Sequence, residues 1–166
     1  MYDVGTLLHN LLFSYQRAAK EVLGDGHEVI YHPTLDLLLK IEGRAKLKLT
    51  SAKTLDEALT NLSTFLVRAQ VLKNFGYRKG EDGKYTVSVE GCVWAGHIHH
   101  ELEPENVICP WAMIAMALVQ KFEVERLKEN GSKYSIDGSE TIIEPLRYGF
   151  SKEEALKLSS SNNKTT

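Results

Sequence analysis

One stretch of the chain, residues 91–111, holds both cysteines, both tryptophans and three of the six histidines. Cysteine sulfur and histidine nitrogen are the atoms that most often bind zinc in proteins. Their concentration in so short a stretch predicts a metal site, and we expect the rest of the chain to form the scaffold around it. The candidate zinc ligands are Cys92, His97, His100 and Cys109.

The choice among the histidines depends on the backbone of this stretch. On a helix, His97 and His100 would share a face, because they are three residues apart. On an extended chain, Cys92 and His100 would share one face, with His97 and His99 on the other. The spacing alone leaves both arrangements open.

Cys109 lies directly before Pro110, a residue suited to the first position of a helix. The helix dipole at that end lowers the pKa of a thiol and favours the thiolate that binds metal. A structural alternative makes Cys92 a small core residue and Cys109 a helix cap, with the histidines in a solvated loop. A catalytic alternative uses the same cluster, either as a zinc with an open position and Glu101, Glu103 or Glu105 as base, or as a thiol nucleophile at Cys109. Four ligands with two sulfurs more often close a zinc site, so we expect a structural zinc without catalysis.

The net charge of the 166-residue chain is −2, which gives no electrostatic basis for binding nucleic acid. No apolar run is long enough to span a membrane, and the N-terminus lacks a signal-peptide pattern. We therefore expect a cytoplasmic protein that does not insert into membranes. We expect one domain over residues 1–150, followed by a short helix and a disordered polar tail over 151–166.

Hydrophobic spacing predicts helices over residues 3–23 and 33–43, a third after the capping box Thr54-Leu-Asp-Glu57, and a fourth from Pro110 that continues through the charged segment 121–130. Two hairpins are expected, with turns at residues 80–83 and 137–139. On the first helix, His9 falls on the polar side and is expected at the surface. Together these elements predict an α+β fold, with N-terminal helices packed on a small antiparallel sheet and a buried helix after the Cys/His stretch.

Two short segments carry a resemblance to a known family. Gly91-Cys-Val-Trp-Ala-Gly, followed by the histidines and by Val107-Ile-Cys-Pro-Trp-Ala, resembles the 4-vinyl-reductase-type domains, which bind small molecules or hydrocarbons. Their α+β fold is shared with the transport-particle subunits of Golgi trafficking and with haem nitric-oxide sensors. The resemblance covers residues 1–148, although only 91–112 is specific.

The resemblance implies a zinc held beside a ligand pocket, with Cys109 matching the family's cysteine before the buried helix, and it implies a homodimer. The chain departs from the family in having histidines where relatives often use Cys or Glu. Its last hairpin also lacks the Glu-x-x-Cys…Cys run common in such domains.

We therefore expect a zinc-containing domain that binds or senses a small hydrophobic molecule, without catalysis and as a homodimer. The pocket would be lined by the helix after Pro110 and by the strand before the Cys/His stretch. The candidate ligand-binding residues are Val87, Trp94, Trp111, Met113 and Met116. Two alternatives stay open: a zinc-dependent or thiol enzyme of hydrolase or reductase type that uses the same cluster, and a structural dimeric interaction module.

Overall fold

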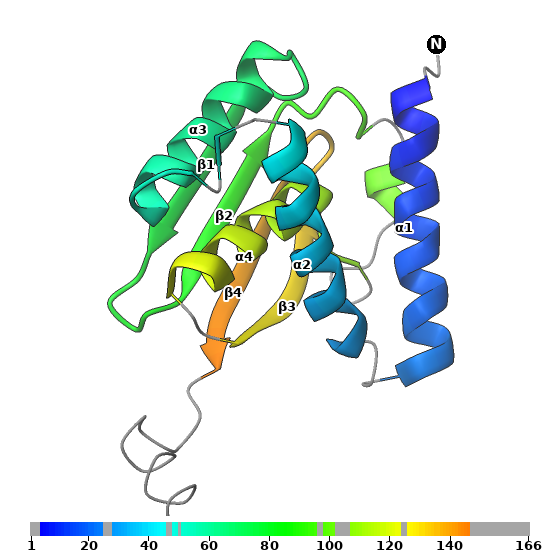
Figure 1. Cartoon of the computed structure of the whole chain (residues 1–166). Helices are drawn as coiled ribbons and strands as arrows, with labels where there is room; N and C mark the ends of the chain where they lie inside the picture. The colour runs from blue at the N-terminus through cyan, green and yellow to red at the C-terminus, as the bar shows by residue number, and fades with distance from the viewer. Residues whose placement is uncertain are drawn as a thin grey trace, which may run out of the picture.

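The computed structural model describes residues 4–24, 28–45, 48–49, 51–95, 98–101, 107–123 and 126–146 (Figure 1). Within these ranges the chain forms helices and one antiparallel sheet, which confirms the expected α+β class. The helices are α1 (Val4–Leu23), α2 (Glu28–Ala45), α3 (Leu55–Arg68), the short 3-10 helix η2 (Ile98–Glu101) and α4 (Pro110–Glu123). The strands are β1 (Asn74–Lys79), β2 (Tyr85–Glu90), β3 (Arg126–Tyr134) and β4 (Ser139–Leu146).

The sheet consists of two hairpins joined through their second strands. Its strand order is β1-β2-β4-β3, and every neighbouring pair is antiparallel. Both hairpins confirm the sequence prediction. The charged segment 121–130, however, does not continue the last helix: α4 ends at Glu123, and β3 begins at Arg126. Pairing with β4 makes residues 126–130 a strand, because strand formation depends more on the neighbouring strand than on local propensity.

One face of the sheet is buried under helices. Along β2 the buried side chains are Tyr85, Val87 and Val89, which alternate as the sequence predicts. The register continues this face onto β4, where Thr141 lies opposite Val87 and Ile143 opposite Tyr85. Helix α3 packs on β1, α4 packs on β2 and β3, and α2 packs on α4 as an outer layer (Figure 1).

The helix starts agree with the sequence in part. The Thr54 hydroxyl accepts a hydrogen bond from the Glu57 amide (3.2 Å), as a capping box requires. The Glu57 carboxylate accepts from the amide of Lys53 rather than from Thr54 (2.7 Å). Helix α2 begins at Glu28, so Pro33 lies inside the helix and not at its first turn. A proline there removes one backbone hydrogen bond, which the flanking turns of α2 must offset.

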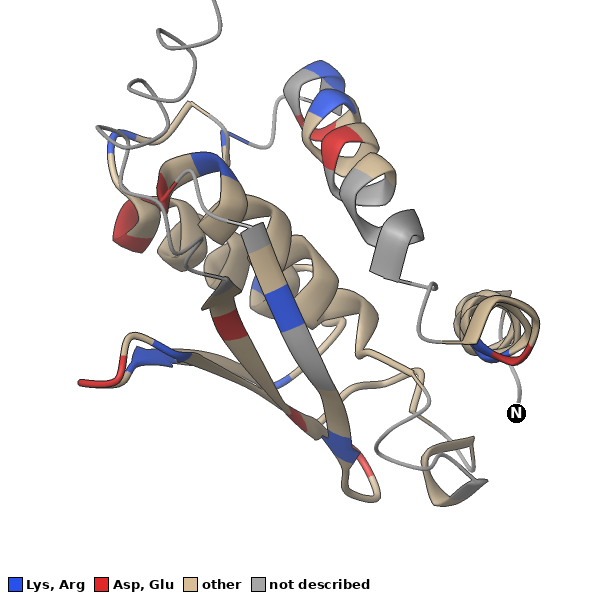
Figure 2. Ribbon diagram, turned by 90° about the horizontal axis from the view of Figure 1, so that it is seen from below, with Lys and Arg blue, Asp and Glu red and all other residues tan. Residues whose placement is uncertain are grey.

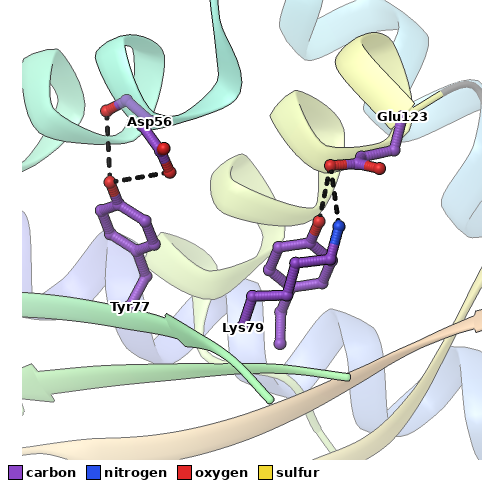
Figure 3. A network of polar contacts seen from close by, with 5 residues as sticks. Asp56, Tyr77, Lys79 and Glu123 are labelled. Carbon is purple, nitrogen blue, oxygen red and sulfur yellow. Dashed lines mark hydrogen bonds and ion pairs between the residues drawn. The ribbon is translucent and has the colours of Figure 1, made fainter. Parts of the chain in front are cut away.

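Polar side chains fasten the β1–β2 hairpin to two helices (Figure 3). The Tyr77 hydroxyl lies 3.3 Å from both the main-chain oxygen and Oδ1 of Asp56 in the first turn of α3. The Tyr85 hydroxyl and Lys79 Nζ both donate to Oε1 of Glu123 at the end of α4, over 2.8 and 3.1 Å. These donors lower the pKa of Glu123. The contacts fix both helices over the hairpin at its outer end.

Three expectations from the sequence concern the membrane, the cellular location and the C-terminal residues. No helix in the described ranges is both long and apolar enough to cross a membrane. The cytoplasmic location stays a prediction. The expected C-terminal helix and tail, residues 151–166, lie outside the described residues.

Candidate functional site

Helix α1 stands at the outside of the molecule, where Figure 2 shows it end-on beside the N mark. Its inward face is partly polar. Its buried side chains are Thr6, His9, Phe13 and Gln16. Most of its large apolar side chains are exposed instead: Val4, Leu7, Leu8, Leu11, Leu12, Tyr15, Val22 and Leu23. His9 is only 4% exposed, so the expectation that it lies at the surface was wrong. The His9 side chain points inward because it contacts the rings that hold α1 against the rest of the molecule.

The inner face of α1 packs against aromatic side chains from three other segments. The ring centroid of His9 lies 4.6 Å from that of Phe13, 6.0 Å from that of His99 in η2 and 6.5 Å from that of Trp111 in α4. Trp94, in the loop after β2, lies 5.2 Å from Trp111. Such contacts add to the energy of apolar burial. The Cys/His stretch therefore meets α1 through its aromatic and imidazole rings.

A cavity of about 340 Å³ lies between α1, α2, Trp94 and the start of α4. Its lining consists of Gly5, Leu8, His9, Leu12, Leu38, Trp94, Pro110, Trp111, Met113 and Ile114. None of these residues carries a formal charge when His9 is neutral. A volume at the lower end of the range for ligand sites, with apolar walls and few polar groups, is typical of a small-molecule pocket.

A second apolar cavity of about 140 Å³ adjoins the first. The two share Leu38, Trp111 and Ile114, and the second extends between α2, α3 and α4 past Phe65 and Leu118. Because the shared side chains form a common wall, rotation of Trp111 would change the size of both cavities.

Glycine at position 5 allows α1 to approach Trp94. A Cβ atom at this position would collide with the Trp94 indole ring. The close contact places this indole against α1, where it forms one wall of the larger cavity.

Two polar atoms on lining residues are buried without a hydrogen-bond partner among the described residues: His9 Nε2 and Trp111 Nε1. Burial, and secondarily the neighbouring His99, lower the pKa of His9 to about 4, so His9 is neutral at pH 7. His99 is neutral as well, because burial lowers its pKa. His99 Nδ1 lies 3.0 Å from the carbonyl oxygen of Ser135, so this nitrogen carries the proton. The other nitrogen, His99 Nε2, is then a bare acceptor, also buried and without a partner in the described part of the chain.

The ligand-binding residues expected from the sequence fall into two groups. Trp94, Trp111 and Met113 line the larger cavity. Val87 and Met116 are each 1% exposed and belong to the core between sheet and α4. Sequence reasoning missed the contribution of α1, although Thr6, His9, Phe13 and Gln16 have the three-and-four spacing of one helix face and could have indicated it.

Both cysteines are buried free thiols in the core, at the N-terminal end of α4. The amide of Cys109 donates to the Ser132 hydroxyl over 2.8 Å, and that hydroxyl is also hydrogen-bonded to Thr141. Burial raises the pKa of Cys109, and the nearby Cys92 raises this pKa further. Hydrogen bonds from the Ser139 hydroxyl and the helix amides lower the pKa, but the effect of burial is larger. The helix terminus therefore acts on the Cys109 pKa in the expected direction, but desolvation is the larger effect and the pKa is raised overall.

The described residues alone do not make up a zinc site. Among them, no three His, Cys, Asp or Glu side chains are arranged to hold a metal ion. His100 is exposed in η2, and His97 lies outside the described residues. Two core sulfur atoms supply half of a four-ligand set, so further ligands would have to come from segments such as the one that contains His97. Zinc binding stays a prediction.

No family model, curated protein or solved structure matches the chain. The resemblance to 4-vinyl-reductase-type domains therefore stays a prediction, carried by residues 91–112.

Proposed function

We propose that this protein binds a small apolar molecule in the cavity between α1, Trp94 and the first turns of α4. The observation that carries the proposal is the cavity of about 340 Å³, whose described lining side chains are apolar apart from His9 and the two indole nitrogens. Burial of apolar ligand surface there would contribute roughly 25 cal/mol per Å² before the costs of association.

The thiol-enzyme alternative has less support from the described residues. A nucleophilic cysteine needs a lowered pKa and access to substrate. Cys109 is 3% exposed, and burial raises its pKa. The sulfur atoms also belong to the core cluster and do not line the cavity. We therefore favour binding or sensing over catalysis at this site.

A matched pair of variants tests the proposed site. Leu12 lines the cavity, whereas Leu7, on the same helix, is exposed and does not line it. We expect Leu12→Phe, which partly fills the cavity, to weaken binding of tert-butylcyclohexane at least about fivefold in calorimetric titrations, in line with the 1–3 kcal/mol typical of overpacking. Leu7→Phe should bind like the wild type. Equal binding by all three proteins would place the hydrocarbon elsewhere.

A second candidate function, self-association, is favoured by the outward face of α1. Its exposed residues include a three-and-four repeat, the spacing that pairs helices in coiled coils. The repeat consists of Val4, Leu8, Leu11, Tyr15, Ala18 and Val22. Leu11 is 64% exposed and Val22 81%, so a stripe along the whole helix is open to solvent. Exposed apolar surface of this kind marks interaction sites.

We propose that a second copy of the chain covers this stripe in an antiparallel arrangement. Around a two-fold axis near residue 13, the repeat is self-complementary: Val4 would meet Val22, and Leu8 would meet Ala18. The charged side chains of α1 all lie in its last two turns, at Arg17, Lys20 and Glu21. Antiparallel pairing keeps each charged residue away from the same residue of the second copy and opposes the two helix dipoles, whereas parallel pairing would bring identical charges together.

The size of the stripe sets the expected strength of this dimer. A 20-residue helix is about 30 Å long and ~10 Å wide with its side chains. Such a face is smaller than the ~800 Å² per partner of a standard interface, so dissociation in roughly the micromolar range is expected. Sedimentation velocity from low to high micromolar concentration should show a monomer–dimer equilibrium. Leu11→Glu should abolish it and Ser14→Glu should not; a wild type that stays monomeric throughout would contradict the dimer.

A further inference from the structure

We infer that the molecule bound in the larger cavity is uncharged and carries one hydrogen-bond acceptor, such as a carbonyl oxygen, that receives the Trp111 Nε1–H. This inference rests on the proposed function and specifies the chemical class of its ligand. It would not apply to a pure hydrocarbon, nor to a fatty acid bound as its carboxylate.

The first support is the indole nitrogen of Trp111. An indole N–H can only donate, and in the described part of the protein this donor is buried without an acceptor. A buried donor without a partner is unfavourable, and an acceptor that reaches it restores the lost hydrogen bond. Trp111 lines the cavity, although its nitrogen is closed to a water molecule there, so a ligand acceptor reaches this nitrogen once the indole ring turns toward the cavity.

The second support is the charge of the lining. Among the described residues that line this cavity there is no Lys, Arg, Asp or Glu. His9, the one titratable residue of the lining that the structure describes, is neutral at pH 7. A carboxylate or ammonium group would be transferred from water to an apolar wall without a counter-charge, which is far more costly than burial of a neutral carbonyl.

His9 provides a second polar contact of adaptable character. A neutral imidazole nitrogen donates in one tautomer and accepts in the other, so His9 Nε2 can pair with a carbonyl or a hydroxyl group. The residue is 4% exposed, which holds its ring in place against Phe13. A neutral ketone, ester or amide on an apolar skeleton can accept from either atom, and an alcohol can also donate to His9.

Three compounds of one skeleton separate these possibilities: 4-tert-butylcyclohexanone, tert-butylcyclohexane and 4-tert-butylcyclohexanecarboxylate. Their dissociation constants are measured by calorimetry on the wild type, Trp111→Phe and Trp94→Phe, with folding checked by circular dichroism. Trp94 is the matched control, because it is the other indole of the same cavity and its nitrogen is not among the buried unpartnered atoms of the described residues.

We expect Trp111→Phe to weaken the ketone about five- to tenfold more than the hydrocarbon, the effect of one net hydrogen bond. Trp94→Phe should weaken the two compounds equally, and the carboxylate should bind at least tenfold more weakly than the ketone. Equal losses for ketone and hydrocarbon in Trp111→Phe, or a carboxylate that binds as tightly as the ketone, would overturn the inference and leave the proposed function standing. Failure of all three compounds to bind the wild type would overturn both.

Discussion

The side-chain amide of Gln16 pairs with both backbone groups of Ile108. Its Oε1 accepts from the Ile108 amide over 2.9 Å, and its Nε2 donates to the Ile108 carbonyl over 3.1 Å. This pair joins α1 to the segment directly before α4 and explains why a glutamine, and not a leucine, lies on the inner face of the helix. The larger cavity exists because α1 is held there.

Loss of this pair should release α1. Gln16→Leu would leave the amide and carbonyl of Ile108 buried without partners, at a cost of about 1–3 kcal/mol each. We expect the free energy of unfolding by urea to fall by roughly 2–4 kcal/mol and the tryptophan emission to shift to longer wavelength. Gln16→Glu keeps one acceptor oxygen but sets a buried carboxylate against the Ile108 carbonyl, so it should be destabilised at pH 7 and regain part of the stability at low pH, where the protonated carboxyl can donate to that carbonyl. A Gln16→Leu protein as stable as the wild type would show that α1 is held by other contacts.

His9 should make stability depend on pH. Its pKa is about 4 in the folded protein, below the ordinary value of 6.5, so the unfolded chain binds more protons between these values. Stability is therefore complete above pH 6.5 and falls as the pH drops toward 4. With ~1.4 kcal/mol per pKa unit over a shift from 6.5 to about 4, the loss at pH 4 is roughly 3 kcal/mol. The lowered pKa of His99 acts in the same direction.

Comparison with His9→Gln isolates the His9 contribution, because glutamine does not titrate in this range. Urea unfolding of the wild type and of His9→Gln at pH 7 and pH 4 gives the loss of unfolding free energy in each protein, and the difference between the two losses is the His9 contribution. Equal pH dependence of the two proteins would mean that His9 does not stay neutral in the folded state.

Gly5→Ala offers a test of the contact between α1 and Trp94. In an exposed helix this change stabilises by about 1 kcal/mol. Here the new methyl group would collide with the indole ring of Trp94. We expect lower stability and altered tryptophan fluorescence. A more stable variant with unchanged emission would show that Trp94 does not pack on Gly5.

The predicted zinc calls for elemental analysis of protein purified without added metal or a histidine tag. We expect stoichiometric zinc that is lost, together with thermal stability, in Cys109→Ser and in His97→Ala. Loss of zinc without loss of stability would point to the catalytic alternative. A wild type free of zinc would remove the metal from the proposed function and leave the apolar cavity unaffected.

The sequence predicted the elements whose pattern is local. The alternation of Tyr85, Val87 and Val89 and the apolar run after Pro110 each identify a buried surface, and the structure confirms both. Arg126 to Asn130 has no such pattern and takes its structure from pairing with β4. The strand could not be recognised without its partner.

The sequence predicted only part of the residues that line the cavity. Trp94, Trp111 and Met113 come from the stretch that stood out by composition, and all three line the cavity. The wall contributed by α1 was missed, because a helical pattern shows which side chains share a face and not which face turns inward. The leucines of α1 dominate the pattern, whereas Gln16 and His9 decide the orientation through contacts with segments about 90 residues away.

Tryptophan fluorescence during titration with tert-butylcyclohexane tests the central claim most directly. The chain has two tryptophans, and both line the cavity, so any molecule that enters it must alter their emission. We predict a saturable change in the emission of the wild type that Leu12→Phe weakens and Leu7→Phe leaves intact. Emission that stays unchanged up to the solubility limit of the hydrocarbon would contradict the proposal that this cavity binds apolar molecules.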